Sequence, residues 1–371
     1  MKIAVNTRLL LKDKLEGIGW FSYEVLKRIT TQHPEHEFIF LFDRPYSEEF
    51  IFSSNITPIV ISPPTRHPIL WYIWFELMLP RVLKKHKPDL FFSPDGYISL
   101  SSGIKTVTAI HDINFEHNPQ DLPFLISKYY RKYFRKYAQK AHRIITVSEF
   151  SKKDISETYL IPASKIDVCY NGANSVYKEL SEKITTEIKS EFTEKENYFI
   201  FIGALHPRKN VERLLLSFDM FKQKTSSNMK LVIVGEKMFK NKQIHHTFNN
   251  MEFKNEVIFT GRLSAEKLSF MLGSAFALVF VPYFEGFGIP IVEAFNCGVP
   301  VITSNVTSMP EVGGNAAMLV DPYSVESICE RMIILYENED FRKDLIQKGN
   351  LRKLQFSWDK TAENVWASLM N

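Results

Sequence analysis

Short apolar runs alternate with amphipathic helical patterns along almost the whole chain, and this alternation limits the possible folds more than any other feature. The runs that we predict to be strands lie at residues 2–7, 37–42, 90–93, 106–110, 143–147 and 166–169, and then at 198–202, 230–234, 257–260, 276–281, 299–303 and 318–320. Strands that alternate with helices build parallel sheets with crossover helices. The sequence therefore predicts an α/β fold with parallel sheets.

The stretch 176–197 divides this alternation into two halves. It is rich in Lys, Glu and Thr and lacks the pattern of a buried strand, so we interpret it as a linker with a short helix. We predict two Rossmann-like domains, 1–175 and 198–355, and a C-terminal helix, 356–371, that packs back toward the first domain. Ligands bind such sheets outside the carboxyl ends of the strands, so we expect the site in a cleft where the two sheets face each other.

Composition argues against several classes of protein. The three cysteines, Cys169, Cys297 and Cys329, are odd in number and widely spaced, which argues against a disulfide framework or a structural zinc site. No stretch approaches about 18 uncharged apolar residues, and polar residues interrupt the N-terminus too early for a signal peptide, so we expect a cytoplasmic protein. The net charge of +4 is too small to indicate nucleic acid, although its positive bias lies in the N-terminal half and suits an anionic surface or substrate.

The stretch 283–293, Y-F-E-G-F-G-I-P-I-V-E, says most about function. An apolar strand runs into an acidic, glycine-rich turn, and a proline then occupies the first turn of a helix, where its missing N–H costs nothing. Gly286 and Gly288 allow a ligand to approach the backbone, and the helix start offers N–H groups to an anion. Glu285 and Glu293 lie at the two ends of this turn, an arrangement that suits a ligand with both phosphate and sugar.

A second anion site is expected where the strand 198–202 ends. Gly203 is followed by Arg208 and Lys209 at the mouth of the apolar helix 211–221. Arg208 can make bidentate contacts to a diphosphate, Lys209 adds a point charge, and the helix start adds N–H donors. Adjacent Arg-Lys pairs also occur in solvated surface loops, and the sequence leaves both interpretations open.

Two segments of the N-terminal half carry weaker signals. Gly17 and Gly19 open the predicted helix 20–29, and their amides could touch a phosphate across the cleft, but a plain helix-capping turn would look the same. His111 and Asp112 follow the strand 106–110, where His111 could bind a sugar hydroxyl or shuttle a proton. A buried histidine with satisfied hydrogen bonds is the alternative interpretation of this pair.

Two basic and aromatic segments, 68–87 and 127–143, are candidates for contact with an anionic membrane surface. In the second segment, one helical face carries Tyr130, Tyr133, Phe134, Tyr137 and Ala141. An aromatic stripe of this kind more often packs in the core while the cations form a solvated face. Peripheral contact with the inner face of the membrane is therefore one of two interpretations.

Five segments in order along nearly the whole chain resemble retaining glycosyltransferases of family 4, which have the GT-B fold. They are G-I-G-W-F-S, the strand ending in His111-Asp112, V-S-E-F-S-K-K-D-I with V-C-Y-N-G-A-N after it, G-A-L-H-P-R-K-N, and E-G-F-G-I-P-I-V-E-A followed by G-V-P-V-I. Phe295 and Asn296 depart from the family pattern, which affects helix packing more than chemistry. The chain has no Asp-x-Asp, Gly-x-Ser-x-Gly, P-loop or His-Glu-x-x-His motif, so hydrolase, kinase and metalloprotease functions lose support.

The resemblance implies a role for each candidate residue. Glu285 would contact the donor hexose near the reaction centre, and His111 would touch the same sugar. Arg208 and Lys209 would hold the diphosphate and stabilise it as the leaving group, without a metal or another cofactor. Glu293 would bind the ribose hydroxyls. The other donor-binding residues would be Gly17, Gly19 and Asp112 from the first domain and Gly203, Arg262, Leu263, Gly286, Phe287, Gly288 and Ile289 from the second, with Arg262 and Leu263 bordering the base.

The implied reaction moves a hexose from a nucleotide sugar to a cell-surface polysaccharide or lipid-linked oligosaccharide, with retention of anomeric configuration. The G-I-G-W-F-S loop, the His111-Asp112 turn and the segment M-P-E-V-G-G-N-A-A resemble the mannosyl- and rhamnosyl-transferring branch, which favours GDP-mannose as the donor. A nucleotide-sugar epimerase of the same fold and a non-catalytic two-domain sugar-binding protein are the alternatives.

Overall fold

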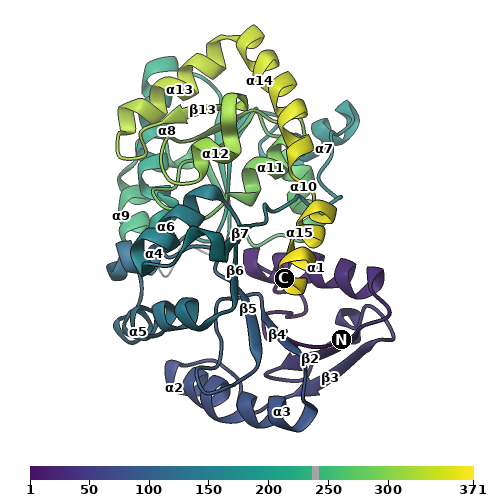
Figure 1. Cartoon of the computed structure of the whole chain (residues 1–371). Helices are drawn as coiled ribbons and strands as arrows, with labels where there is room; N and C mark the ends of the chain where they lie inside the picture. The colour runs from purple at the N-terminus through teal and green to yellow at the C-terminus, as the bar shows by residue number, and fades with distance from the viewer. Residues whose placement is uncertain (236–241) are drawn as a thin grey trace. The chain divides into compact units, whose positions relative to one another are not determined.

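The computed structural model describes residues 1–235 and 242–371, which form two compact units. Unit 1 contains Met1–Asn171 together with Ser357–Asn371, and unit 2 contains Gly172–Phe356. The polypeptide therefore leaves unit 1 once and returns to it for its last helix (Figure 1).

Unit 1 is built on a seven-stranded sheet in the order β3-β2-β1-β4-β5-β6-β7, in which every neighbouring pair is parallel. The strands are β1 (Lys2–Asn6), β2 (Glu37–Phe42), β3 (Ile56–Val60), β4 (Leu90–Ser93), β5 (Lys105–Ala109), β6 (Arg143–Thr146) and β7 (Ile166–Val168). The helices are α1 (Gly17–Gln32), α2 (Pro68–Tyr72), α3 (Leu79–His86), α4 (Asn114–His117), α5 (Phe124–Lys140), α6 (Glu149–Tyr159) and α15 (Trp358–Met370). A π-helix, η2 (Ile73–Met78), joins α2 to α3, so that 68–86 runs as one continuous helix.

Unit 2 is built on a six-stranded parallel sheet in the order β10-β9-β8-β11-β12-β13. The strands are β8 (Tyr198–Ile202), β9 (Lys230–Val234), β10 (Val257–Gly261), β11 (Ala277–Phe280), β12 (Val301–Ser304) and β13 (Ala317–Val320). The helices are α7 (Glu182–Phe192), α8 (Val211–Thr225), α9 (Lys242–Asn250), α10 (Ala265–Gly273), α11 (Ile289–Asn296), α12 (Met309–Gly313), α13 (Val325–Glu337) and α14 (Glu339–Arg352). The central strands β8 and β11 consist of buried residues, as expected for a parallel sheet covered on both faces.

These two sheets confirm the predicted α/β fold, and the predicted strands lie within two residues of the observed ones. Among the described strands, only β3 was not predicted. Its sequence I-T-P-I-V contains Pro58, and the four residues after the buried Ile56 are half-buried or exposed. Because β3 lies at the edge of the sheet, it tolerates a proline and a weak apolar pattern that would be costly in a central strand.

Both sheets reverse their strand order at a corresponding place. In unit 1, β1 lies between β2 and β4, and in unit 2, β8 lies between β9 and β11. Neighbouring loops depart to opposite faces of the sheet at such a switch point and leave a crevice at the carboxyl ends of the strands. The loops after β1 and β4, and those after β8 and β11, are therefore where each sheet is expected to bind a ligand.

The C-terminal helix α15 completes unit 1 by packing on α1. The Arg28 guanidinium lies 2.5 Å from the Asp359 carboxylate, and the Trp366 ring stacks on His33 with 3.8 Å between the ring centroids. Phe21 of α1, which is fully buried, meets the edge of Trp358 with 6.4 Å between centroids. The last residues of the chain thus cover an apolar face that forms near its beginning.

Candidate active site

Arg208, Lys209 and Glu285 meet at the switch point of unit 2. Arg208 and Lys209 lie in the loop after β8, and Glu285 lies in the loop after the neighbouring strand β11. The Arg208 Nη1 atom donates to the Glu285 Oε2 atom at 2.6 Å, and the Lys209 ammonium donates to the same oxygen. The structure therefore brings together three of the four residues that the sequence predicted to be catalytic.

A network of backbone contacts fixes these loops. The Arg208 side chain also donates to the Phe284 carbonyl at 3.1 Å, and the Arg208 carbonyl accepts from the Tyr283 N–H at 3.0 Å. The Ser308 hydroxyl donates to the Glu285 carbonyl at 2.8 Å. These bonds tie the β8 and β11 loops to one another, so both cations are held in place before any ligand arrives.

Asn210 is a supporting residue that the sequence did not reveal. Its backbone is left-handed at φ 62°, and its buried side-chain amide donates to the Val281 and Pro322 carbonyls at 3.0 and 2.7 Å. An asparagine tolerates this conformation better than most residues. Asn210 immediately precedes α8, so its two bonds anchor the helix start beside Lys209.

The charges at this site are unequal, because two cations share one carboxylate. Burial raises the pKa of Glu285, but the charges of Arg208 and Lys209 lower it by more, so the net pKa lies below its usual value. Glu285 is therefore ionised at neutral pH, and the group of three carries one net positive charge. Glu285 thus orients both cations, and a diphosphate could replace its carboxylate as their partner.

Glu293 lies one helical turn inside α11, whose start is shaped by glycine. Gly288 caps α11 with φ 91°, and a Cβ atom there would lie 2.7 Å from the Met309 Cε atom, so glycine is required on both counts. Burial raises the pKa of the half-buried Glu293 to about 7, and a hydrogen bond from the Tyr177 hydroxyl acts in the opposite direction. Tyr177 lies in the predicted linker and was not recognised as a site residue.

The other predicted residues of unit 2 lie along the same edge of its sheet. Gly286 and Phe287 are buried between Glu285 and α11, and Ile289 is the first residue of that helix. Gly203 follows β8 directly, and the exposed Arg262 and half-buried Leu263 follow β10. Because the sheet is parallel, these positions all lie at the carboxyl ends of its strands.

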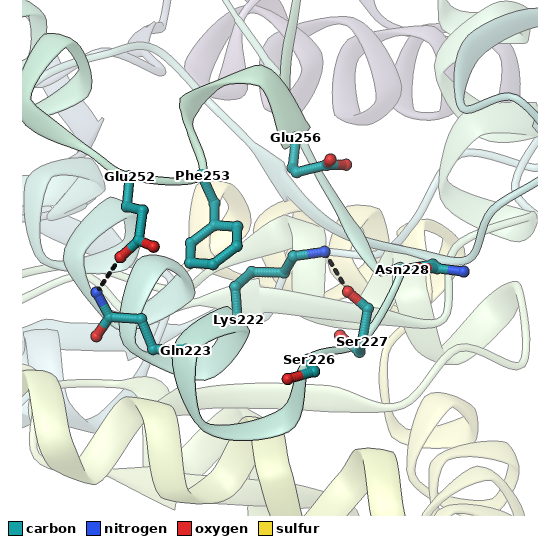
Figure 2. A pocket seen from close by; sticks show the side chains of 8 residues that line it. All are labelled: Lys222, Gln223, Ser226, Ser227, Asn228, Glu252, Phe253 and Glu256. Atoms are coloured by element: carbon teal, nitrogen blue, oxygen red, sulfur yellow. Dashed lines mark hydrogen bonds between the residues drawn. The ribbon is translucent and has the colours of Figure 1, made fainter.

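A polar pocket of about 430 Å³ lies at the opposite edge of this sheet, where the strands begin (Figure 2). Its lining residues are Lys222, Gln223, Ser226, Ser227, Asn228, Glu252, Phe253 and Glu256. Lys222 is buried and donates to the carbonyls of Ser227 and Met229, which secures the turn between α8 and β9. We interpret this pocket as structural, because its central cation already serves the backbone.

His111 is the fourth predicted catalytic residue and belongs to unit 1. Its Nε2–H donates to the Pro94 carbonyl at 2.9 Å, and the Phe21 ring meets it edge-on with 4.8 Å between centroids. Burial lowers its pKa by more than the Pro94 carbonyl and the charges of Asp112 and Asp95 raise it, so the imidazole is neutral at pH 7. The tautomer with Nε2 protonated leaves a lone pair on Nδ1 that can accept a hydroxyl hydrogen bond.

The structure corrects the predicted start of the helix that contains Gly17 and Gly19. We expected a loop before a helix that begins at residue 20, whereas α1 begins at Gly17. Glu16 is extended and its carbonyl accepts from the Trp20 N–H at 2.7 Å, so the first helical turn closes around both glycines. A Cβ atom on Gly19 would lie 3.1 Å from the Leu9 carbonyl, while one on Gly17 would meet no atom within 4 Å.

Asp112 has a local structural partner. Its Oδ1 atom accepts from the Asn114 N–H at 3.0 Å and so shapes the turn after β5. This bond uses one of its two carboxylate oxygens. The position remains at the carboxyl edge of the unit 1 sheet, next to His111.

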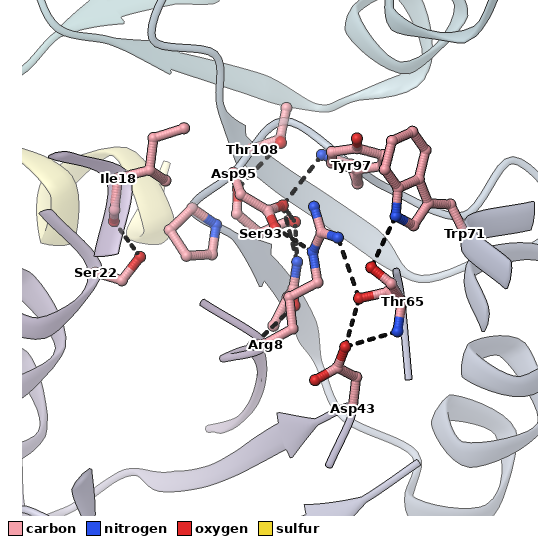
Figure 3. A network of polar contacts seen from close by, with 12 residues as sticks. Arg8, Ile18, Ser22, Asp43, Thr65, Trp71, Ser93, Asp95, Tyr97 and Thr108 are labelled. Atoms are coloured by element: carbon pink, nitrogen blue, oxygen red, sulfur yellow. Dashed lines mark hydrogen bonds and ion pairs between the residues drawn. The ribbon is translucent and has the colours of Figure 1, made fainter. Parts of the chain in front are cut away.

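A buried polar network that no sequence pattern predicts lies at the switch point of unit 1 (Figure 3). Arg8 follows β1 and Asp95 follows β4, and the Arg8 Nε atom lies 2.5 Å from the Asp95 carboxylate with both side chains buried. Thr65 accepts from Arg8 at 3.2 Å and donates to Asp43, and the Arg8 guanidinium lies 4.2 Å from the centre of the Tyr97 ring. These residues are isolated and far apart in the sequence, so they form no local motif that would predict the network.

Neither a metal cluster nor a membrane-spanning helix is found in residues 1–235 and 242–371. No group of three or more His, Cys, Asp or Glu side chains lies close enough together there to hold a metal ion. No helix in the same residues is long and apolar enough to cross a bilayer.

Comparison with known proteins gives the family. A family model described as Glycosyltransferase Family 4 matches residues 16–176, and one described as Glycosyl transferases group 1 matches residues 182–352. The chain is 27% identical over 371 residues to O-antigen chain mannosyltransferase B of Escherichia coli, covering 97% of each chain. It is 30% identical over 285 residues to O-antigen chain mannosyltransferase RfbU of Salmonella typhimurium, covering 75% of this chain and 74% of the relative. The chain belongs to glycosyltransferase family 4.

Solved structures agree on the fold of this family 4 glycosyltransferase. WaaG, a glycosyltransferase involved in lipopolysaccharide biosynthesis, matches with a TM-score of 0.78 at 16% identity over 100% of both chains. HepE from Anabaena, solved in complex with UDP and glucose, matches with a TM-score of 0.79 at 16% identity, again over 100% of both chains. The predicted GT-B class, with one parallel sheet in each of two Rossmann-like units, is confirmed.

Proposed function

We propose that this glycosyltransferase is a retaining, metal-independent enzyme that moves mannose from GDP-mannose to a surface polysaccharide or lipid-linked oligosaccharide. The observation that carries the proposal is the trio of Arg208, Lys209 and Glu285 at the switch point of unit 2. Two fixed cations suit a nucleoside diphosphate, and a carboxylate beside them suits the hydroxyls of the attached sugar.

The trio suggests how the donor is received. Glu285 neutralises one of the two cations. When the diphosphate binds, its oxygens take over the contacts to Arg208 and Lys209, and the Glu285 carboxylate is released to contact the hexose. The cations then lie where negative charge grows as the bond between the sugar and the β-phosphate breaks, which stabilises the transition state.

Retention of configuration fits this arrangement chemically. The acceptor hydroxyl attacks the anomeric carbon from the face that the diphosphate leaves, and a departing phosphate oxygen takes the hydroxyl proton. The phosphate thus serves as the base, so the protein needs to supply only position and charge. Neutral His111 contributes a hydrogen-bond acceptor, which suits a sugar hydroxyl better than a charged imidazolium would.

The choice of mannose is supported by the relatives. The two O-antigen mannosyltransferases described above are aligned over most or all of the chain. The same relatives are named for the O-antigen chain, which supports a surface glycan or its lipid-linked precursor as the acceptor, and we propose peripheral contact of this enzyme with the inner face of the membrane.

A donor screen tests the proposal directly. A ligand that binds only the folded state raises the melting temperature by mass action, so GDP-, UDP- and dTDP-sugars can be ranked by thermal shift. We expect GDP-mannose to give the largest shift and to release GDP only when an oligosaccharide acceptor is added. Release of a free sugar or an epimer without acceptor would contradict transfer, and a larger shift with a UDP-sugar would contradict the donor.

The absence of a metal requirement has its own test. We expect full turnover in excess EDTA, because Arg208 and Lys209 supply the positive charge at the leaving group. A loss of turnover that added Mg²⁺ or Mn²⁺ restores would contradict this part of the proposal.

A further inference from the structure

Two tyrosines of unit 2 lie with their rings nearly parallel at the carboxyl edge of the sheet. Tyr283 follows β11 and is half-buried, and Tyr323 lies between β13 and α13 with 59% of its surface exposed. Their ring centroids are 6.3 Å apart, and the ring planes differ by 22°. Single exposed rings are common, but two aligned rings at the edge where a parallel sheet binds its ligands indicate a contact surface.

The backbone around both tyrosines is tied to the loop that carries the diphosphate cations. The Tyr283 N–H donates to the Arg208 carbonyl at 3.0 Å. The Pro322 carbonyl, next to Tyr323, accepts from the Asn210 side-chain amide at 2.7 Å. The two rings therefore share their backbone supports with the residues assigned to the donor phosphates.

Arg213 holds the Tyr323 ring from the first turn of α8. The guanidinium carbon of Arg213 lies 5.6 Å from the ring centre, and its Nη1 atom donates to the Asn210 side-chain oxygen at 3.0 Å. The Asp321 carboxylate accepts from the Tyr323 N–H at 2.9 Å and fixes the turn before α13. Because these contacts hold the ring in place, little side-chain freedom is lost when a ligand binds to it.

The chemistry of the two rings suits a saccharide. The face of an aromatic ring carries partial negative charge, whereas the C–H groups on one face of a pyranose ring are apolar and weakly positive. The phenol groups of both tyrosines can also exchange hydrogen bonds with sugar hydroxyls. A wholly apolar ligand would cover these phenol groups without pairing them, which costs free energy.

The strand order separates Tyr323 from the part of the sheet that is expected to border the base of the donor. Arg262 and Leu263 follow β10, which is one edge strand, and Tyr323 follows β13, which is the opposite edge strand. A base that lies against Arg262 and Leu263 would therefore be remote from Tyr323. This arrangement favours a saccharide over the nucleoside of the donor as the partner of the two rings.

We propose that Tyr283 and Tyr323 form a stacking platform for a pyranose ring of the acceptor saccharide. The platform lies beside the loop of the diphosphate cations, so a saccharide bound there is held near the bond that breaks in the donor. The inference rests on the proposed function, because it assigns a binding surface to the acceptor of that reaction.

Binding of oligosaccharides to the purified full chain, with no donor present, tests the platform. Mannotetraose and chitotetraose serve as probes, and NMR titration measures their dissociation constants. We expect at least one probe to bind, and Tyr323→Ala to raise its Kd about tenfold because the stacking surface is lost. Tyr323→Phe should keep this Kd within about twofold, because it retains the ring.

Phe124→Ala is the matched control, because Phe124 is an aromatic residue of unit 1 that is 75% exposed and lies at the start of α5. It should leave the Kd of the probe unchanged, and thermal melting checks that each variant is folded. No binding of either oligosaccharide to the unmodified protein, or an unchanged Kd in Tyr323→Ala, would overturn the proposal.

A titration with GDP separates acceptor from donor. Tyr323→Ala should leave the Kd of GDP within about twofold, because the platform does not contact the nucleotide. A loss of GDP affinity as large as the loss of oligosaccharide affinity would assign the rings to the donor and overturn the acceptor assignment.

Turnover measurements distinguish this inference from the proposed function. With GDP-mannose and an oligosaccharide acceptor, Tyr323→Ala should raise the KM for the acceptor about tenfold and leave kcat within about twofold. An unchanged acceptor KM in a protein that transfers mannose would remove the platform and keep the function. Oligosaccharide binding that depends on Tyr323, in a protein that turns over no nucleotide sugar, would keep the platform and remove the function.

Discussion

Glu285 contacts both Arg208 and Lys209, but the other contacts of these two cations differ. Arg208 also bonds to the Phe284 carbonyl, whereas Lys209 lies 4.8 Å from the centre of the Phe280 ring. Besides their shared contact with Glu285, the arginine is thus held by a backbone carbonyl and the lysine by an aromatic ring. Neither can move far to take over the position of the other.

Arg208→Ala and Lys209→Ala should each lower kcat by about 10²–10³, because each removes one preorganised charge from the leaving group. The measurement is initial rate at saturating donor. Lys224→Ala, an exposed change at the end of α8, is the matched control and should keep the full rate. Near-normal kcat in both cation variants, with unchanged melting temperatures, would refute the phosphate assignment.

Glu293→Gln should change how stability depends on pH. The folded pKa of Glu293 is raised to about 7, so the folded state binds its proton more tightly than the unfolded state does. That stability is fully present below the unfolded pKa of about 4.5 and is lost as pH rises to about 7. Urea unfolding at pH 5 and pH 8 should show a loss of about 1–2 kcal/mol in the unmodified protein, after allowance for partial exposure, that is absent in the variant. Equal pH dependence in the two proteins would show that Glu293 keeps an ordinary pKa.

At this scale the sequence revealed the residues that sit in dense local patterns. Arg208, Lys209 and Glu285 stand beside glycines at strand ends, and their meeting follows from the parallel sheet. The sequence alone could not reveal the roles of Asn210 and Tyr177, because their hydrogen-bond partners lie more than 70 positions away along the chain. Side-chain partners across a fold leave no trace in local spacing.

At the scale of elements, a buried ion pair and its hydrogen bonds connect the loops that follow three strands of unit 1. Arg8 and Asp95 connect the loops after β1 and β4, and Thr65 connects Arg8 to Asp43 after β2. Buried ion pairs contribute little net stability over apolar packing, but breaking one leaves an uncompensated charge. The network therefore makes the carboxyl edge of this sheet sensitive to single substitutions.

Asp95→Asn should lower the free energy of unfolding of unit 1 by about 3–5 kcal/mol, because the buried Arg8 charge loses its partner. Asp167→Asn is the control, since its pair with Arg143 is partly exposed and should cost at most about 1 kcal/mol. All five tryptophans belong to unit 1, so tryptophan fluorescence during urea unfolding reports this unit alone. Equal losses in the two variants would show that the Arg8 pair is not a special constraint.

Most elements were predictable because buried parallel strands are short, apolar and flanked by helices. The two failures have physical causes. The edge strand β3 is half-solvated and contains Pro58, so it lacks the apolar signal of a central strand. The helix α1 begins at Gly17 although glycine is a poor helix former, since the packing of Gly19 against Leu9 and Leu15 decides the conformation.

At the scale of the molecule, the cations assigned to the donor diphosphate, Arg208 and Lys209, and the carboxylate assigned to the ribose, Glu293, lie in unit 2, which is one uninterrupted segment of chain. The fragment 172–356 should therefore fold alone and bind GDP, although more weakly than the full chain, and should transfer no sugar. Calorimetric titration measures the binding, and Arg208→Ala in the fragment is the control that should abolish it. A folded fragment without any affinity for GDP, next to a full chain that binds it, would place the nucleotide site elsewhere.

The chain path through the two units has a consequence for synthesis on the ribosome. Unit 1 is complete only when α15 has been synthesised, whereas unit 2 ends at Phe356, just before that helix. At about 5–20 residues per second, the roughly 340 residues from the end of α1 to the end of α15 take roughly 17–70 s to synthesise, and the apolar face of α1 around Phe21 stays uncovered for that time. Unit 2 can therefore finish folding first, although it is the later part of the chain, and the newborn N-terminal unit is the part that most needs a chaperone.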